Sequence, residues 1–177
     1  MRPRPLVLVC DVSGSMAPYA RMLLQYLQAS VTARRRVEAF ALGTRLTRVT
    51  LELAGRDPDA ALKRATRSVV DLSGGTRIGA AVKQFLDTDG RRGLARGAVV
   101  VIVSDGWERA DPAQLAEQMR RLALLAHRVI WVNPRKAAPG FAPLTGGMAA
   151  ALPHIDTFVA GHSAQSIQDL LDAIATA

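Results

Sequence analysis

Two continuous apolar runs of strand length constrain the fold of this chain more than any other feature. Residues 6–10 read LVLVC and residues 98–103 read AVVVIV, and neither run contains a charged residue. Such runs are typical of parallel strands buried on both faces, whereas strands with one face in water alternate apolar and polar residues. The chain therefore needs helices on both sides of a central sheet.

Helical and strand-like segments alternate along the rest of the sequence. Apolar periodicity predicts helices from residue 20 to 31, over 58–70, 78–86 and 111–126, and in a closing segment around 167–174. Asp57 and Pro58 begin the second of them, and Pro112 lies just inside the fourth. Short apolar runs predict further strands over 37–42, 46–51, 128–132 and 155–159. Only residues 43–45 separate two of these strands, so that pair is predicted to form an antiparallel hairpin. Residues 133–153 are expected to be irregular.

The pattern predicts an α/β fold: a doubly wound, mostly parallel central sheet with one antiparallel edge strand and helices on both faces, which is a Rossmann-like arrangement. A chain of 177 residues fits one domain, and we expect residues 1–177 to form it. The single cysteine, Cys10, excludes a disulfide scaffold. The apolar runs are far shorter than the ~20 residues of a membrane span, and no charged-then-apolar leader precedes residue 6, so we expect a cytoplasmic protein.

Oxygen-bearing side chains follow the predicted strands and lie in neighbouring loops. Asp11, Ser13 and Ser15 come directly after the first strand, Thr76 ends a loop that begins at residue 71, and Asp105 follows the run 98–103. Ligands of such sheets bind beyond the carboxyl ends of the strands. Carboxylate and hydroxyl oxygens suit Mg²⁺, with Mn²⁺ or Ca²⁺ as substitutes.

The pattern D-x-S-x-S, a threonine after a glycine pair, and S-D-G after a later strand together resemble the von Willebrand factor type A (VWA) domain. The resemblance extends from residue 6 to the final helix and implies the metal-ion-dependent adhesion site (MIDAS) of that family. Residue by residue, the implied metal ligands are Asp11, Ser13, Ser15, Thr76 and Asp105. The three hydroxyls would contact the metal, the two aspartates would act directly or through water, and a carboxylate of a partner protein would fill the open coordination position.

Softer motifs resemble the CoxE-like subfamily of these domains. They are Asn133-Pro134, the segment GMAAALP over residues 147–153, Asp156, and Gly106-Trp107-Glu108. Members are linked to MoxR-type AAA+ ATPases and to maturation of metalloenzymes such as molybdenum-dependent carbon monoxide dehydrogenase. The resemblance implies a non-enzymatic, Mg²⁺-dependent protein-binding module that serves as adaptor or co-chaperone to such an ATPase.

Enzymatic interpretations meet specific obstacles. An aspartyl phosphatase needs a second carboxylate two positions after its nucleophile, and Ser13 occupies that position. A serine hydrolase needs a G-x-S-x-G elbow, which is absent, and the three histidines are His127, His154 and His162. Without a metal, Asp11, Ser13 and Ser15 would be read as helix-capping and turn residues. Trp107 fits either an exposed partner anchor or a side chain packed in its loop.

The formal net charge of +8 is unevenly distributed. Residues 1–97 carry 17 basic and 8 acidic side chains, and residues 98–177 carry 6 and 7. The excess favours a solvated basic face, but a nucleic-acid-binding A-like domain that uses the basic N-terminal half is the alternative function. Four of the five predicted ligands lie in the basic half, so an acidic protein partner is the preferred explanation, with Arg45 and Arg77 assisting its approach.

Overall fold

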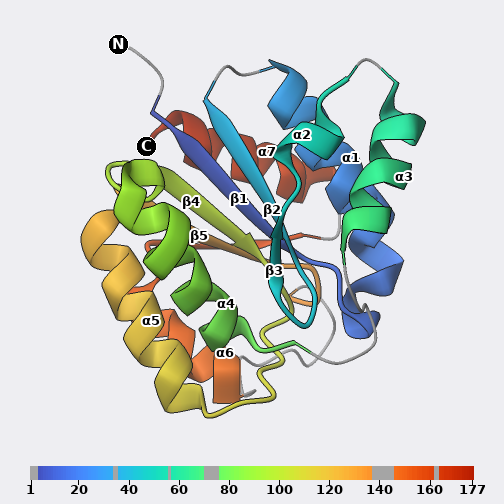
Figure 1. The fold of residues 1–177 in the computed structure, drawn as a ribbon. Helices are drawn as coiled ribbons and strands as arrows, with labels where there is room; N and C mark the ends of the chain where they lie inside the picture. The colour runs from blue at the N-terminus through green and yellow to red at the C-terminus, as the bar shows by residue number, and fades with distance from the viewer. Residues whose placement is uncertain (1–3, 34–35, 56, 70–75, 137–145, 162–163) are drawn as a thin grey trace.

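The fold is a six-stranded sheet between two layers of helices. The computed structural model describes residues 4–33, 36–55, 57–69, 76–136, 146–161 and 164–177. The strand order is β3-β2-β1-β4-β5-β6, and every neighbouring pair is parallel except β2 and β3. The strands are β1 (Leu6–Asp11), β2 (Val37–Leu42), β3 (Leu46–Arg48), β4 (Val99–Val103), β5 (Arg128–Asn133) and β6 (Thr157–Ala160). The predicted α/β class and its antiparallel edge strand are confirmed (Figure 1).

The two apolar runs become the two central strands of this sheet. β1 and β4 pair in parallel, with Leu6 opposite Val99 and Cys10 opposite Val103. The chain leaves β1 toward β2 on one side, and β4 begins the half of the sheet on the other side. The order of strands therefore reverses between β1 and β4, and this is the point where open α/β sheets bind their ligands.

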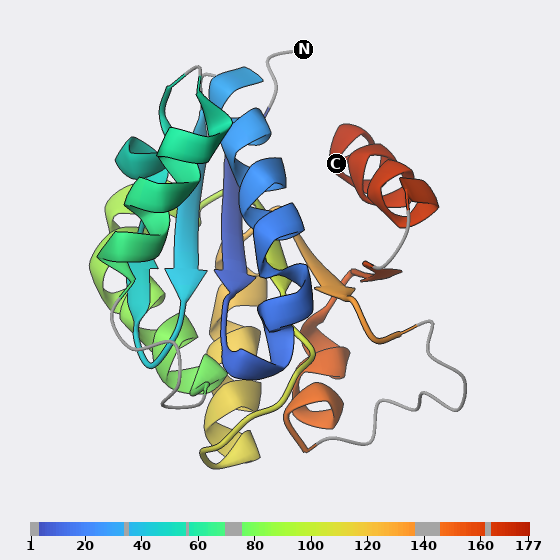
Figure 2. The same cartoon turned by 90° about the vertical axis from the view of Figure 1, so that its right-hand side faces the viewer.

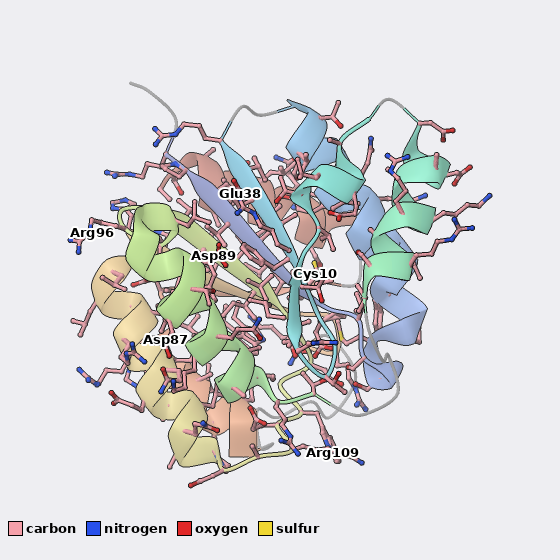
Figure 3. All side chains as sticks on the ribbon, viewed as in Figure 1. Cys10, Glu38, Asp87, Asp89, Arg96 and Arg109 are labelled. Atoms are coloured by element: carbon pink, nitrogen blue, oxygen red, sulfur yellow. The ribbon has the colours of Figure 1, made fainter. Side chains whose placement is uncertain are left out.

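Helices cover both faces because side chains on a strand alternate between faces. Leu6, Leu8 and Cys10 pack on the face under α1 (Ala17–Ala33), α2 (Thr50–Leu53), α3 (Pro58–Ser68) and α7 (Ala164–Ala175). Val7 and Val9 pack on the face under α4 (Ile78–Phe85), α5 (Pro112–Leu125) and α6 (Gly146–Ala151). Figure 2 shows the two layers on either side of the strands. Cys10 lies inside the first layer, and burial raises the pKa of its thiol far above the ordinary value (Figure 3).

Aspartates cap two helices where the sequence predicts their beginnings. The carboxylate of Asp57 accepts hydrogen bonds from the backbone N–H groups of Asp59 and Ala60, and Asp111 accepts one from Ala113. Proline follows each of these aspartates, in the first turn, where a missing N–H costs nothing. α4 begins without such a side-chain cap on its own N-cap residue, Arg77.

Several predicted boundaries or segments differ from the structure. The strand predicted over 46–51 ends at Arg48, and residues 50–53 form α2 instead. The Thr50 hydroxyl accepts a hydrogen bond from the Ala39 N–H and donates one to Glu38, which turns the chain away from β2. The last strand starts at residue 157 rather than 155.

The segment 133–153 is not irregular throughout. Asn133 still belongs to β5, and residues 146–151 form α6, which a 3₁₀ turn, Leu152–His154, continues. α6 consists of glycine and alanine apart from Met148, so apolar periodicity could not indicate it. Residues 137–145 lie outside the described ranges.

None of the helices in the described ranges combines the length and the apolar content that crossing a bilayer requires.

Candidate metal centre

Asp11 lies at the end of β1, beside the end of β4, and is completely buried. Because Cys10 pairs with Val103, the next residues, Asp11 and Ser104, lie side by side at the carboxyl edge of the sheet. The Ser104 hydroxyl donates a hydrogen bond of 2.7 Å to Oδ2 of Asp11 and accepts one from the Gly106 N–H. Strand register therefore joins the D-x-S-x-S and S-D-G segments directly.

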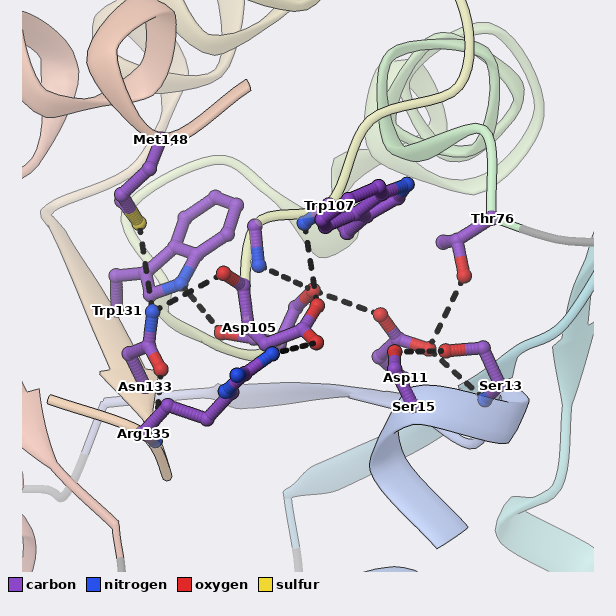
Figure 4. A network of polar contacts seen from close by, with 12 residues as sticks. Asp11, Ser13, Ser15, Thr76, Asp105, Trp107, Trp131, Asn133, Arg135 and Met148 are labelled. Atoms are coloured by element: carbon purple, nitrogen blue, oxygen red, sulfur yellow. Dashed lines mark hydrogen bonds and ion pairs between the residues drawn. The ribbon is translucent and has the colours of Figure 1, made fainter. Parts of the chain in front are cut away.

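The other carboxylate oxygen of Asp11 accepts hydrogen bonds from two of the remaining predicted ligands. Oδ1 accepts a hydrogen bond of 2.9 Å from the Ser13 N–H and one of 3.3 Å from the Thr76 hydroxyl. The hydroxyls of Ser13 and Ser15 are 3.3 Å apart. The loop after β1 thus curls back toward its own aspartate, and Thr76 reaches it from the start of α4 (Figure 4).

Asp105 brings a second carboxylate to the same edge. Its Oδ1 accepts a hydrogen bond of 3.1 Å from the Trp107 N–H. Its Oδ2 is buried and has no hydrogen-bond partner among the described residues. A buried carboxylate oxygen without a hydrogen bond is costly unless a cation compensates for the lost water, and Arg135, at 3.9 Å, forms only a long ion pair with it. The donor set, two carboxylates with neighbouring hydroxyls, therefore fits a hard divalent cation such as Mg²⁺.

The electrostatics of Asp11 favour the same conclusion. Burial raises the pKa of Asp11, hydrogen bonds from Ser13 and Ser104 oppose the rise, and the charge of Asp105 adds to it. The mutual repulsion of the two carboxylates raises the pKa of Asp11. A cation between them would attract both charges and lower that pKa. Within the described ranges no three His, Cys, Asp or Glu side chains come together as a metal site. The other side-chain oxygens close to Asp11 belong to hydroxyls, those of Thr76 and Ser104 among them.

Glu108 holds the two loops of the centre together, a role that the sequence did not reveal. Its Oε2 accepts a hydrogen bond of 2.8 Å from the Gly79 N–H in the first turn of α4, and its Oε1 accepts one from Ala110. The Arg109 N–H donates to the carbonyl of Thr76. The loop after β4 thus supplies the cap that α4 lacks and positions Thr76.

Three more residues support the loop that carries Asp105. The Trp131 indole N–H donates to the Ser104 carbonyl, and the Asn133 amide donates to the Asp105 carbonyl. Gly147 lets α6 approach, since a Cβ there would lie 2.5 Å from the Gly106 carbonyl oxygen. Asn133 is a polar residue at the end of a neighbouring strand, and that position could have indicated its role. The supporting roles of Trp131 and Gly147 are visible only from tertiary contacts.

The structure brings all five predicted ligands to one edge of the sheet: Asp11, Ser13, Ser15, Thr76 and Asp105. Trp107 is 59% exposed, which agrees with the partner-anchor interpretation rather than with packing in its loop. Arg45 and Arg77 are exposed. The glycine pair before Thr76 and His162 lie outside the described residues.

Glu108→Ala is expected to lower the free energy of unfolding by about 1 kcal/mol, because the first turn of α4 loses its cap. For a chain of this size that corresponds to about 2–4 °C in Tm. Thermal unfolding followed by circular dichroism measures it. Glu117→Ala is the matched control, since Glu117 is an exposed carboxylate paired with Arg120 on α5. Equal effects of the two substitutions would contradict the capping role.

Comparison with known proteins agrees with this architecture. Residues 1–167 match the family model described as VWA domain containing CoxE-like protein. No curated protein matches the chain by sequence.

Solved structures with the same fold are distant in sequence. A von Willebrand factor type A structure from Catenulispora acidiphila is 17% identical, with a TM-score of 0.64 over 98% of this chain and 42% of that one. Manganese-loaded TRAP protein from Plasmodium vivax is 22% identical, with a TM-score of 0.51 over 74% and 57%. Proximal thread matrix protein 1 from the mussel byssus, with a zinc-occupied MIDAS motif, is 15% identical, with a TM-score of 0.60 over 97% and 47%.

The chain spans about half the length of these structures: 42%, 57% and 47%. At such identities they show the fold alone. The family match covers most of the chain, and the order of strands and the D-x-S-x-S and S-D-G loops at the switch point accord with it. The chain belongs to the family of VWA domain containing CoxE-like proteins.

Proposed function

We propose that the protein is a metal-dependent protein-binding module whose MIDAS-type centre holds Mg²⁺. The observation that carries the proposal is the buried Oδ2 of Asp105, which has no hydrogen-bond partner among the described residues and lies beside the carboxylate of Asp11. Two neighbouring buried carboxylates repel each other, and a divalent cation would compensate both. The manganese and zinc of the TRAP and byssus structures support a divalent metal at this edge.

The residues that would hold the ion are Asp11, Ser13, Ser15, Thr76 and Asp105. The ion would supply a Lewis-acidic position for one more oxygen ligand. Of these side chains only Ser15 is exposed, at the outer end of the group. Two negative charges and three neutral hydroxyls leave room for an anionic ligand, and a carboxylate on the surface of a partner protein has the required chemistry.

The surface next to Asp105 suits a protein partner. Trp107 follows Asp105 directly, and exposed aromatic side chains are enriched among the residues that dominate protein–protein affinity. Exposed Arg77 follows Thr76, and exposed Arg45 lies in the turn after β2, so positive charge is available to attract an acidic surface.

The family suggests the partner: we infer a MoxR-type AAA+ ATPase, with the present chain as its adaptor or co-chaperone in metalloenzyme maturation. We further propose that the module catalyses no reaction itself. Ser13 occupies the position at which an aspartyl phosphatase would need its acid, and Asp11 is enclosed by hydrogen bonds rather than open to a substrate.

Asp105→Asn is expected to abolish metal-dependent capture of the ATPase, because the amide removes one of the two charges that attract the cation. A purified MoxR-type ATPase from the same organism would be passed over immobilised protein, with Mg²⁺ or with a chelator. Wild-type protein should retain the ATPase with Mg²⁺ and release it on chelation, and Asp105→Asn should retain little in either buffer. Capture that survives both the chelator and the substitution would contradict the proposal.

A further inference from the structure

Arg135 is a cation next to the metal centre. Its Nη1 lies 3.9 Å from Oδ2 of Asp105, the oxygen that has no hydrogen-bond partner among the described residues. The Arg135 side chain is 57% exposed, whereas that of Asp105 is 2% exposed. The separation is too long for a hydrogen bond but within the range of an ion pair, so the two groups attract each other without a hydrogen bond.

The backbone of Arg135 is fixed on the same loop system that carries Asp105. The Arg135 N–H donates a hydrogen bond of 2.9 Å to Oδ1 of Asn133, and the Asn133 amide donates to the carbonyl of Asp105. One asparagine side chain therefore ties both residues together at the carboxyl ends of β4 and β5 (Figure 4). The backbone of the arginine is held, and its partly exposed side chain extends toward the Asp105 carboxylate.

The Asp105 carboxylate is flanked on both sides by exposed side chains. Trp107 binds Oδ1 through its backbone N–H, and Arg135 lies near Oδ2. A metal ion held by Asp105 would offset the negative charge that now faces Arg135. The guanidinium would then be free for another anion, and its planar fork matches both oxygens of a carboxylate.

We propose that Arg135 is a specificity-determining residue that pairs with the partner carboxylate bound at the metal centre. This inference rests on the proposed function. The ligand is an aspartate or glutamate side chain of a protein, with one oxygen directed to the ion and the carboxylate also paired with the guanidinium. Arg135 thereby selects a carboxylate over a neutral amide, which could offer an oxygen to the ion but no charge to the arginine.

The test separates metal binding from carboxylate binding. Mn²⁺ affinity is measured by tryptophan fluorescence, since Trp107 adjoins Asp105. Binding of N-acetylglutamate amide and N-acetylglutamine amide to the Mn²⁺-loaded protein is then followed by water-proton relaxation. Arg96→Gln is the matched control, because it removes one exposed positive charge just before β4, at the opposite end of that strand from Asp105.

Arg135→Gln is expected to bind the glutamate probe about five- to tenfold more weakly while keeping wild-type or tighter Mn²⁺ affinity. Arg135→Lys should recover part of the lost affinity for the glutamate probe, since lysine keeps the positive charge but lacks the planar guanidinium that can pair with both carboxylate oxygens. Arg96→Gln should stay within about twofold of wild type. An unchanged glutamate preference in Arg135→Gln, or an equal loss in Arg96→Gln, overturns the inference and leaves the proposed function standing. Loss of Mn²⁺ binding in Arg135→Gln would assign Arg135 to the metal site instead. Wild-type protein with no preference for glutamate over glutamine would contradict the proposed function itself.

Discussion

Asp11→Asn is expected to weaken Mg²⁺ binding on the order of 100-fold or more, the largest effect of any single substitution on the centre. Asp11 is completely buried, and its two oxygens organise Ser13, Thr76 and Ser104. The amide keeps the size of the side chain and an acceptor for the Ser13 N–H, but it removes the charge that a cation needs. Isothermal titration calorimetry with Mg²⁺ measures the change.

The fold should survive this substitution. Burial and the nearby Asp105 raise the pKa of Asp11, which means that its charged form is disfavoured in the metal-free protein. A neutral amide avoids that penalty, so the metal-free Asp11→Asn protein should unfold at the wild-type temperature or above it. Asp57→Asn is the control, since asparagine caps a helix as well as aspartate and α3 lies away from the centre. Wild-type Mg²⁺ affinity in Asp11→Asn would remove Asp11 from the ligand set.

Trp131→Ala is expected to lower the free energy of unfolding by about 3–5 kcal/mol. Trp131 is completely buried in the layer under α4, α5 and α6, and its indole also holds the Ser104 carbonyl. The substitution leaves a cavity and an unpaired carbonyl. Domains of this kind are stable by about 5–15 kcal/mol, so the loss is a large fraction of the total. Urea unfolding followed by circular dichroism measures it.

Trp131→Phe separates packing from hydrogen bonding. Phenylalanine retains most of the apolar volume and loses the indole N–H, so a cost of about 1–3 kcal/mol is expected from the unpaired Ser104 carbonyl. Because Trp107 is then the single tryptophan of the chain, its fluorescence reports Mg²⁺ binding without background. A cost in Trp131→Ala no greater than in Trp131→Phe would show that the indole volume contributes little.

The strands and most helices followed from local patterns because burial on both faces leaves a strong signal. LVLVC and AVVVIV became the two central strands, and Asp57 and Asp111 mark helix beginnings as predicted. α2 and α6 could not be predicted in this way. α2 depends on the contact between the Thr50 side chain and β2, and α6 on the approach of Gly147 to the loop after β4.

The predicted ligand residues share a chemical type, oxygen donors, and a position, the loops after strands. These two properties are local, and they indicated the loops that carry the ligands. The resemblance to the VWA family then selected Asp11, Ser13, Ser15, Thr76 and Asp105 within those loops. The roles of Glu108, Asn133 and Arg135 were not predicted, because each acts through a partner distant in sequence: Gly79, the Asp105 carbonyl, and the Asp105 carboxylate.

Periodicity, apolar runs and motif spacing are properties of neighbouring residues, and they were enough for the fold class, the sheet with its hairpin edge and the candidate ligands. Tertiary structure alone decided that Asp11 and Ser104 share a register, that one oxygen of Asp105 is buried without a hydrogen-bond partner among the described residues, and that Arg135 lies beside it. The physical reason is that burial and charge pairing depend on which segments are in contact in the folded chain. These tertiary contacts follow from the packing of the whole sheet and its helices, and no short stretch of sequence specifies them.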